Sequence, residues 1–211
     1  MMKLFFSPGA CSMASHIGLE ECGEPYEEQP TLLGKGEHRT EAYLKINPRG
    51  KVPALQVDDG QILVENTAIL TYLNRRYPAK KLMPSDPLEE ARAISLMAWF
   101  SNTVHPAYTH TIRPERWVDG DECKASVKEK GTKTFWDGLS EIDSLLQGKQ
   151  WIMGSEFSYV DGYALVFYGW GVRAGLQMTQ LSAYTQWKDR MLARPKVRKI
   201  LESEENVLVK R

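Results

Sequence analysis

The sequence contains few cysteines and no excess of charge of either sign. Its three cysteines, Cys11, Cys22 and Cys123, are an odd number in a chain of 211 residues. They are too few for the disulfide framework of a small secreted protein. The 27 basic and 27 acidic residues give a formal net charge of zero. Such a chain has no overall field to attract nucleic acid or an anionic membrane, so we expect neither as a partner.

Long apolar runs are also missing. The longest strongly apolar run, at 163–172, is about half of the roughly 20 residues that a membrane span needs. The stretch before Pro8 is too short for the apolar region of a signal peptide. Glycine and proline are too few and too scattered for a low-complexity chain. We therefore expect a soluble, cytoplasmic protein with free thiols.

The first 77 residues alternate short strand and helix patterns. The predicted strands are 3–6, 26–29, 54–57 and 62–64, and the predicted helices are 12–22, 41–46 and 66–76. A polar loop is expected at 34–39. The last two strands form a hairpin because Gly60 supplies the positive φ of a tight turn. This order of elements predicts a small α/β unit with a mixed sheet.

The rest of the chain has no strand pattern. Residues 78–87 contain three prolines and predict an interdomain linker. Helices are then predicted at 88–111, 122–147, 158–176, 181–194 and 196–204. Ser158 and Asp161 have the spacing of a capping box at a helix start. We therefore expect an α/β domain at 1–77, a linker at 78–87 and an all-helical domain at 88–211.

The sharpest local motif runs from Ser7 to Ser12, between a strand and a helix. A thiol at a helix N-terminus has a lowered pKa, because free N–H groups and the helix dipole favour the thiolate. Cys11 could therefore be reactive, or could face a bound thiolate to which Ser12 donates its hydroxyl. The alternative is that Cys11 is a small buried residue and Ser12 a helix cap.

Two other stretches could bind a peptide-like ligand. Lys51, Val52 and Pro53 precede a strand, and a cis Val52–Pro53 bond would turn the Val52 backbone outward, although few such bonds are cis. Glu65 and Asn66 stand at the start of a helix, where N–H groups bind carboxylates. The Glu65 side chain could take an ammonium group. Plain helix capping is the alternative for the second stretch.

Taken together and in this order, the motifs resemble the glutathione transferase family. SPGACSMASHIGLEECG is similar to the bacterial beta class, in which a cysteine follows Pro-Gly-Ala. NPRGKVPAL, then DDG and ENTAILTYL, resemble the cis-proline loop and the segment that holds the γ-glutamyl end of glutathione. FSYVDGYAL resembles the capping box of the helical domain. The resemblance covers the whole chain. It implies a thioredoxin-like N-terminal domain with a four-stranded mixed sheet and an all-α C-terminal domain.

The resemblance implies a role for each matching residue. Cys11 would lie beside the glutathione sulfur, with the Ser12 hydroxyl next to it, and these two form the expected catalytic pair. Asp161 would act in folding rather than in catalysis. The residues expected to bind glutathione are Cys11, Lys35, Lys51, Val52, Pro53, Glu65 and Asn66.

The helical domain is expected to supply the pocket for the second substrate. The residues matching that pocket are His105, Tyr108, Trp170 and Arg173. Asn102 and Thr103 match positions that reach across a two-fold dimer to the partner's glutathione. The chain departs from the class at Pro106, which should kink or interrupt its helix, and at 112–117.

The resemblance thus implies a homodimeric glutathione transferase of detoxification, which activates the glutathione thiolate for attack on a small hydrophobic electrophile. Beyond glutathione as cosubstrate it would need no cofactor or metal. His16, His38 and His110 are expected to be partly exposed or capping, because no metal-ligand spacing surrounds them. A thiol–disulfide oxidoreductase or peroxidase using Cys11 stays open, as does a non-catalytic binding protein. An isomerase or dehalogenase would share every motif.

Overall fold

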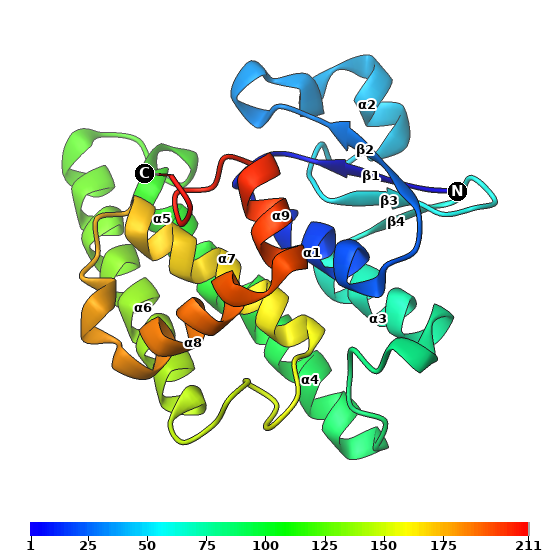
Figure 1. Ribbon diagram of the computed structural model, residues 1–211. Helices are drawn as coiled ribbons and strands as arrows, with labels where there is room; N and C mark the ends of the chain where they lie inside the picture. Colours follow the sequence, from blue (N-terminus) through cyan, green and yellow to red (C-terminus); the bar gives the residue numbers. More distant parts are fainter. Residues whose placement is uncertain (211) are drawn as a thin grey trace.

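The computed structural model describes residues 1–210 and places a small sheet beside a group of helices (Figure 1). The sheet has the strand order β2-β1-β3-β4; β1 is parallel to β2 and antiparallel to β3, and β4 is antiparallel to β3. This confirms the predicted mixed sheet. The elements of this part are β1 (Met2–Phe6), α1 (Met13–Cys22), β2 (Tyr26–Pro30), α2 (Glu41–Ile46), β3 (Ala54–Gln56), β4 (Ile62–Val64) and α3 (Asn66–Arg76).

The segment predicted as a loop at 34–39 is more ordered than expected. It folds into two short 3₁₀ turns, Leu33–Lys35 and Glu37–Arg39. Gly36 joins them with φ of 74°, a value that glycine adopts at little cost. A third 3₁₀ turn, Pro78–Lys80, lies in the predicted linker.

From Pro87 onward the described chain is helical, as predicted. The helices are α4 (Pro87–Trp99), α5 (His105–Ile112), α6 (Asp121–Leu146), α7 (Tyr159–Arg173), α8 (Ser182–Ala193) and α9 (Pro195–Ser203), with 3₁₀ turns at Pro114–Arg116 and Met178–Gln180. None of the helices within residues 1–210 is long and apolar enough to cross a membrane.

The disturbance expected at Pro106 takes the form of a π-helical turn. Residues Phe100–Val104 form this turn between α4 and α5, and the N–H of His105 bonds the carbonyl of Phe100. Pro106 then occupies the first turn of α5. The wider π turn lets the chain pass the proline without ending the helix.

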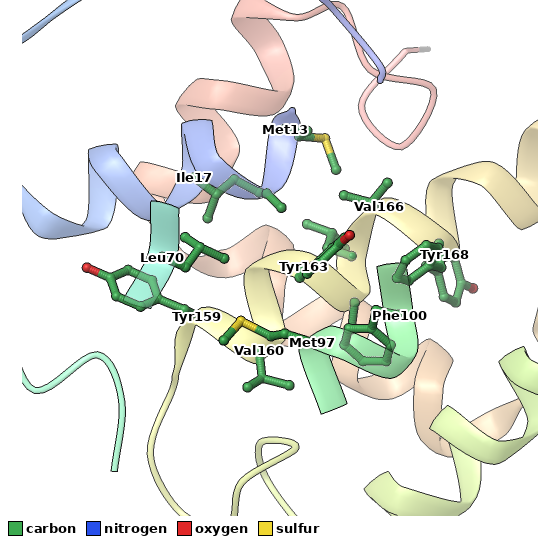
Figure 2. Close-up of a cluster of buried hydrophobic side chains, with 14 of the residues drawn as sticks. Met13, Ile17, Leu70, Met97, Phe100, Tyr159, Val160, Tyr163, Val166 and Tyr168 are labelled. Carbon is green, nitrogen blue, oxygen red and sulfur yellow. The ribbon is translucent and has the colours of Figure 1, made fainter. Parts of the chain in front are cut away.

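One hydrophobic core joins the sheet side to the helical side. Figure 2 shows Met13 and Ile17 of α1, Leu70 of α3 and Tyr163 of α7 pointing into the same cluster. Helix α7 is buried nearly all round, which is the pattern of a helix at the centre of a fold. Because one core holds both parts, residues of the helical part are fixed relative to the turn at residues 7–12.

Asp161 fixes the start of α7, as predicted. Its carboxylate accepts hydrogen bonds from the N–H of Ser158 at 2.9 Å and the Ser158 hydroxyl at 3.0 Å. The same carboxylate also takes the N–H of Ile152 at 3.0 Å and the indole N–H of Trp187 at 2.9 Å. The group is fully buried, and burial raises its pKa. The capping box therefore also ties α7 to α8 and to the segment before it.

Candidate functional site

The turn from Ser7 to Ser12 joins β1 to α1. Gly9 has φ of 68°, and a side chain at this position would overlap the guanidinium of Arg173. The carbonyl of Gly9 accepts the indole N–H of Trp170 at 3.0 Å and the Nη1 of Arg173 at 3.4 Å. The turn is thus attached to α7, which brings the helical part up to Cys11.

Cys11 is half-buried, and three distant stretches meet at it. Its Sγ donates to the carbonyl of Val52 at 3.4 Å. Its own carbonyl accepts the side-chain amide of Asn66 at 3.0 Å. The motifs that the sequence separates by 41 and 55 positions are therefore in direct contact.

The acidity of Cys11 differs from the expectation for a helix N-terminus. Burial raises its pKa to about 12, and the negative charge of Glu65 adds to the effect. The N–H groups of Cys11 and Ser12 and the charge of Lys51 oppose this only in part. Lost hydration outweighs the helix start here, so the thiol is protonated at neutral pH.

Ser12 does not present its hydroxyl to the site. The side chain is fully buried. Its Oγ accepts the N–H of Ser7 at 3.0 Å and donates to the carbonyl of Ser7 at 3.2 Å. Both hydrogen-bonding functions are therefore used inside the turn. This geometry contradicts the expectation that the Ser12 hydroxyl donates to a substrate sulfur. Ser12 instead stabilises the turn that carries Cys11.

The Val52–Pro53 peptide bond is cis, as the resemblance implied. Val52 and Pro53 are buried, while Lys51 is exposed. The carbonyl of Lys51 accepts from the Tyr43 hydroxyl and the Asn47 amide, each at 2.7 Å. Within residues 1–210 the Val52 N–H has no hydrogen-bond partner. Tyr43 and Asn47 thus fix this loop, and the Val52 N–H is available to an extended ligand.

The start of α3 provides a second set of donors. Glu65 has φ of 72°, a conformation that costs energy in a residue other than glycine and is common at functional sites. Its exposed carboxylate lies 3.5 Å from Arg49. The Asn66 side chain is occupied, because its amide N–H donates to Cys11 and its Oδ1 accepts from Ser15 at 2.7 Å. Asn66 can therefore offer a ligand its backbone rather than its side chain.

The hydroxyl of Thr67 is buried and has no partner within the described residues. Buried hydroxyls are nearly always hydrogen-bonded in folded proteins, so this one is open to a water molecule or to a ligand at the helix start. Thr67 was not among the predicted site residues. Its position two residues after Glu65, in the first turn of α3, was the available signal.

The aromatic residues expected in the helical wall come together. The rings of Tyr108 and Trp170 stack with centroids 4.3 Å apart, and the ring of His105 meets Trp170 edge-on at 4.7 Å. Tyr108 is buried, and its hydroxyl has no partner among residues 1–210. Since Trp170 also bonds the turn at Gly9, these rings form a wall near Cys11.

His105 is neutral at physiological pH. Burial lowers its pKa to about 4, and the positive charges of Lys51 and Arg116 act in the same direction. A neutral imidazole can accept a proton or a hydrogen bond. Arg173, at the end of α7, is exposed and contacts Gly9 rather than a carboxylate.

Three other expected site residues are exposed. Lys35 lies in the first 3₁₀ turn, and Asn102 and Thr103 lie in the π-helical turn. The Thr103 hydroxyl donates to the Asn102 amide oxygen at 2.7 Å. The roles expected of these three residues toward glutathione stay predictions.

A buried hydrogen bond between a histidine and a carboxylate behind the turn was not anticipated. His16 is fully buried, and its Nδ1 lies 2.8 Å from the carboxylate of Glu204. The other oxygen of Glu204 accepts the N–H of Gly9 at 2.8 Å. The expectation that His16 is partly exposed or capping is therefore wrong. His16 and Glu204 are 188 positions apart in the sequence, so no local pattern could predict this contact.

The described residues contain no group of three or more His, Cys, Asp or Glu side chains that could hold a metal ion. The site presents N–H and hydroxyl donors, a protonated thiol, charged side chains and aromatic rings. Such groups can bind a peptide-like molecule and stabilise an anionic sulfur.

Comparison with known proteins gives consistent matches. Residues 9–76 match the family model described as the glutathione S-transferase N-terminal domain. The chain is 32% identical to the glutathione S-transferase GstA of Escherichia coli over 205 residues, which are 96% of this chain and 98% of the relative. It is 34% identical to a maleylacetoacetate isomerase of Pseudomonas aeruginosa over 167 residues, 77% of each protein.

Solved structures show the same fold. A glutathione transferase homologue from Sulfitobacter with bound glutathione has a TM-score of 0.90 and 30% identity, covering 96% of this chain and 98% of that one. A bacterial beta class glutathione S-transferase from Sphingomonas chungbukensis has a TM-score of 0.84 and 35% identity, covering 98% of this chain and 100% of that one.

Proposed function

The chain belongs to the glutathione S-transferase family, and from this premise we propose that it binds glutathione and transfers it to a carbon electrophile. The observation that carries the proposal is the meeting of three stretches at Cys11. The thiol contacts Val52, and the backbone of Cys11 contacts Asn66. A cysteinyl backbone on Val52 and a γ-glutamyl end at α3 would place the glutathione sulfur between them, beside Cys11.

The binding roles proposed for the remaining residues follow from their chemistry. The backbone of Val52, presented by Pro53, pairs with the cysteinyl part of glutathione. Glu65 takes the ammonium of the γ-glutamyl group, and the N–H groups at the start of α3 with the Thr67 hydroxyl take its carboxylate. Lys35 and Lys51, both exposed, provide positive charge for the glycyl carboxylate.

The proposed reaction needs only the sulfur of glutathione as nucleophile. The bound thiol gives its proton to solvent, and the sulfur electron pair then forms a bond to carbon. In a substitution, a leaving group departs with its bonding electron pair. When the sulfur instead adds to an activated double bond, the neighbouring carbon takes up a proton. If the protonated Cys11 turns its S–H from the Val52 carbonyl to the thiolate, this hydrogen bond lowers the pKa of glutathione. The wall of His105, Tyr108 and Trp170 holds the electrophile close to the sulfur.

The protonated state of Cys11 favours this proposal over a thiol–disulfide oxidoreductase. The nucleophile of such an enzyme is a thiolate, whereas burial keeps Cys11 protonated. We also propose the finer features that the resemblance implied: a beta-class type of site, a homodimer with Asn102 and Thr103 near the partner's glutathione, and a cytoplasmic detoxifying role.

A second candidate is glutathione-dependent isomerisation, favoured by the similarity to a maleylacetoacetate isomerase over 77% of the chain. In that reaction the thiolate would add to a conjugated double bond, the resulting single bond would rotate, and the sulfur would leave with its electron pair to restore the double bond. The same glutathione site would serve both reactions.

Glutathione titration calorimetry tests the proposal, together with the ultraviolet absorbance of the bound thiolate as a function of pH. We expect binding and a bound-thiol pKa below that of free glutathione. Glu65→Gln and Thr67→Ala should each weaken binding about tenfold, while Asp137→Ala on the exposed face of α6 should not. Absence of binding at millimolar glutathione would overturn the proposal and favour a non-catalytic binding protein.

A further inference from the structure

The peptide unit between Lys51 and Val52 carries two polar groups that face opposite ways. This unit is trans, since the cis bond of the loop is the one after Val52. The N–H and C=O of a trans peptide point to opposite sides within one rigid plane. The N–H of Val52 has no partner within residues 1–210 and is the donor proposed for glutathione. Groups that fix the Lys51 carbonyl on the other side therefore also fix the direction of this N–H.

Two buried side chains fix that carbonyl. The hydroxyl of Tyr43 and the side-chain amide of Asn47 both donate to the carbonyl of Lys51, each at 2.7 Å. Their exposed fractions are 5% and 2%, so both donors are largely shielded from water. Tyr43 stands in α2 and Asn47 at its C-cap, one helical turn later. Together they form a two-donor clamp on the back of the peptide that carries the Val52 N–H.

Each donor of the clamp is itself held in place. The Tyr43 ring packs edge-on against Phe5 of β1, with ring centroids 6.0 Å apart. Burial raises the pKa of Tyr43 to about 12, so its hydroxyl keeps its proton at neutral pH. The Oδ1 of Asn47 accepts the N–H of Arg49 at 3.1 Å, which turns the Nδ2 donor toward Lys51. The clamp is therefore oriented before any ligand binds.

The packing of α2 is directed at this loop. Within α2, Tyr43 is the buried residue. It shares a small hydrophobic cluster with Phe5, Val52 and Ala54, and this cluster is separate from the main core. The ring of Tyr43 supplies the packing, whereas its hydroxyl contacts the Lys51 carbonyl. Removal of the hydroxyl alone should therefore change the loop and leave the main core intact.

We propose that Tyr43 and Asn47 are positioning residues for glutathione, which aim the Val52 N–H at the cysteinyl part of the ligand by holding the Lys51 carbonyl. This role rests on the proposed function, and both residues act through the backbone instead of contacting the ligand. The clamp stops a rotation of the peptide plane that binding would otherwise have to stop. Hydrogen bonds on a carbonyl also polarise its peptide unit, which makes the N–H of that unit a stronger donor.

Titration calorimetry of the full chain with reduced glutathione tests the role of the clamp. Tyr43→Phe removes the hydroxyl and keeps the packed ring. Asn47→Asp removes the Nδ2 donor and keeps an oxygen for the N–H of Arg49. The matched control is Tyr184→Phe in α8. The Tyr184 hydroxyl is also buried and also donates to a backbone carbonyl, that of Ala164, at 2.6 Å.

The two tyrosine variants should differ in binding but not in stability. We expect the Kd of glutathione to rise about 3- to 10-fold in Tyr43→Phe, while Tyr184→Phe keeps the wild-type Kd. Asn47→Asp should raise the Kd about 10-fold, because its carboxylate also repels the Lys51 carbonyl. Urea unfolding should show similar losses for both tyrosine variants, because each loses one hydrogen bond to a backbone carbonyl.

Nuclear magnetic resonance reports on the Val52 N–H directly. Isotope labelling of lysine carbonyl carbons together with valine nitrogens selects the amides of Lys-Val pairs, and the sequence has two, Lys51–Val52 and Lys196–Val197. Glutathione should move the Val52 amide proton downfield, as a new hydrogen bond does, and leave Val197 nearly unchanged. At saturating glutathione the downfield shift should be smaller in the clamp variants than in the wild type and the control.

Three results would overturn the inference while leaving the proposed function intact. The first is a wild-type Kd in Tyr43→Phe. The second is an equal rise of Kd in Tyr43→Phe and Tyr184→Phe, which would assign the effect to general loosening of the fold. The third is a Val52 resonance that does not move when the wild type binds glutathione. Failure of the wild type to bind glutathione would instead overturn the proposed function, and the inference with it.

Discussion

Replacement of Asp161 by alanine should be among the most destabilising single changes in this protein. The carboxylate is fully buried and accepts four hydrogen bonds, two on each oxygen. Alanine would leave three buried N–H donors without an acceptor: those of Ile152 and Ser158 and the indole of Trp187. An unpaired buried donor costs about 1–3 kcal/mol. Since water can enter the vacated space, we expect a loss of about 3–5 kcal/mol.

Asparagine at the same position provides a graded comparison. Its Oδ1 can still accept from Ile152 and Trp187, but its Nδ2 cannot accept from Ser158. Half of the hydrogen bonds therefore survive, and the loss should be about 2 kcal/mol. Asparagine also removes a buried charge, whose cost is visible in the raised pKa of Asp161. The expected order of stability is wild type, then asparagine, then alanine.

Urea unfolding at neutral pH, followed by far-ultraviolet circular dichroism, measures both losses. The transition midpoint should fall while the slope with denaturant stays constant. Asp137→Ala, which breaks an exposed pair with Lys133, should change stability by less than about 1 kcal/mol. A loss below about 1 kcal/mol for Asp161→Ala, or equal losses for alanine and asparagine, would refute the hydrogen-bond argument.

The other predictions concern the thiols and His105. Iodoacetamide at neutral pH should alkylate the exposed Cys123 first, and peptide mapping should show that Cys11 is protected. The reason is that a pKa of about 12 leaves little thiolate at Cys11. Comparable alkylation rates at the two cysteines would contradict this. Cys11→Ala should keep conjugating activity within about tenfold, whereas a thiol–disulfide enzyme would lose it. The pKa of His105 is near 6.5 in the unfolded chain but about 4 in the folded protein. The free energy of unfolding should therefore fall by up to about 3 kcal/mol as the pH drops from 6.5 to 4. Urea unfolding at several pH values should show a smaller fall for His105→Gln than for the wild type.

Much of the fold could be predicted because its signals are local. The hairpin around Gly60, the helix starts and the capping box at Ser158 depend on residues within one turn of each other. The cis bond before Pro53 required the resemblance, since the residue pair alone favours trans. Element order then fixed the mixed sheet, because the strands are short and the connections between them leave few arrangements.

The chemistry of Cys11 was harder to predict because two physical effects oppose each other. Position at a helix start lowers a thiol pKa, and burial raises it. Sequence reveals the first effect directly. The second depends on how closely Val52 and the start of α3 approach the sulfur, and that distance is set by tertiary packing. The same reason explains Ser12, whose hydroxyl turns back to Ser7 because the turn closes on itself.

Long-range contacts decide how the turn at residues 7–12 is held. Gly9 receives Trp170 on its carbonyl and gives its N–H to Glu204, which comes 195 positions later. Glu204 is buried and also hydrogen-bonds His16 of α1, so one side chain joins the segment after α9 to the first helix. A turn anchored on both its carbonyl and its N–H has little freedom to shift. The position of Cys11 is therefore set by the C-terminal segment as well as by its own neighbours, and changes near Glu204 should act on the site without touching a substrate.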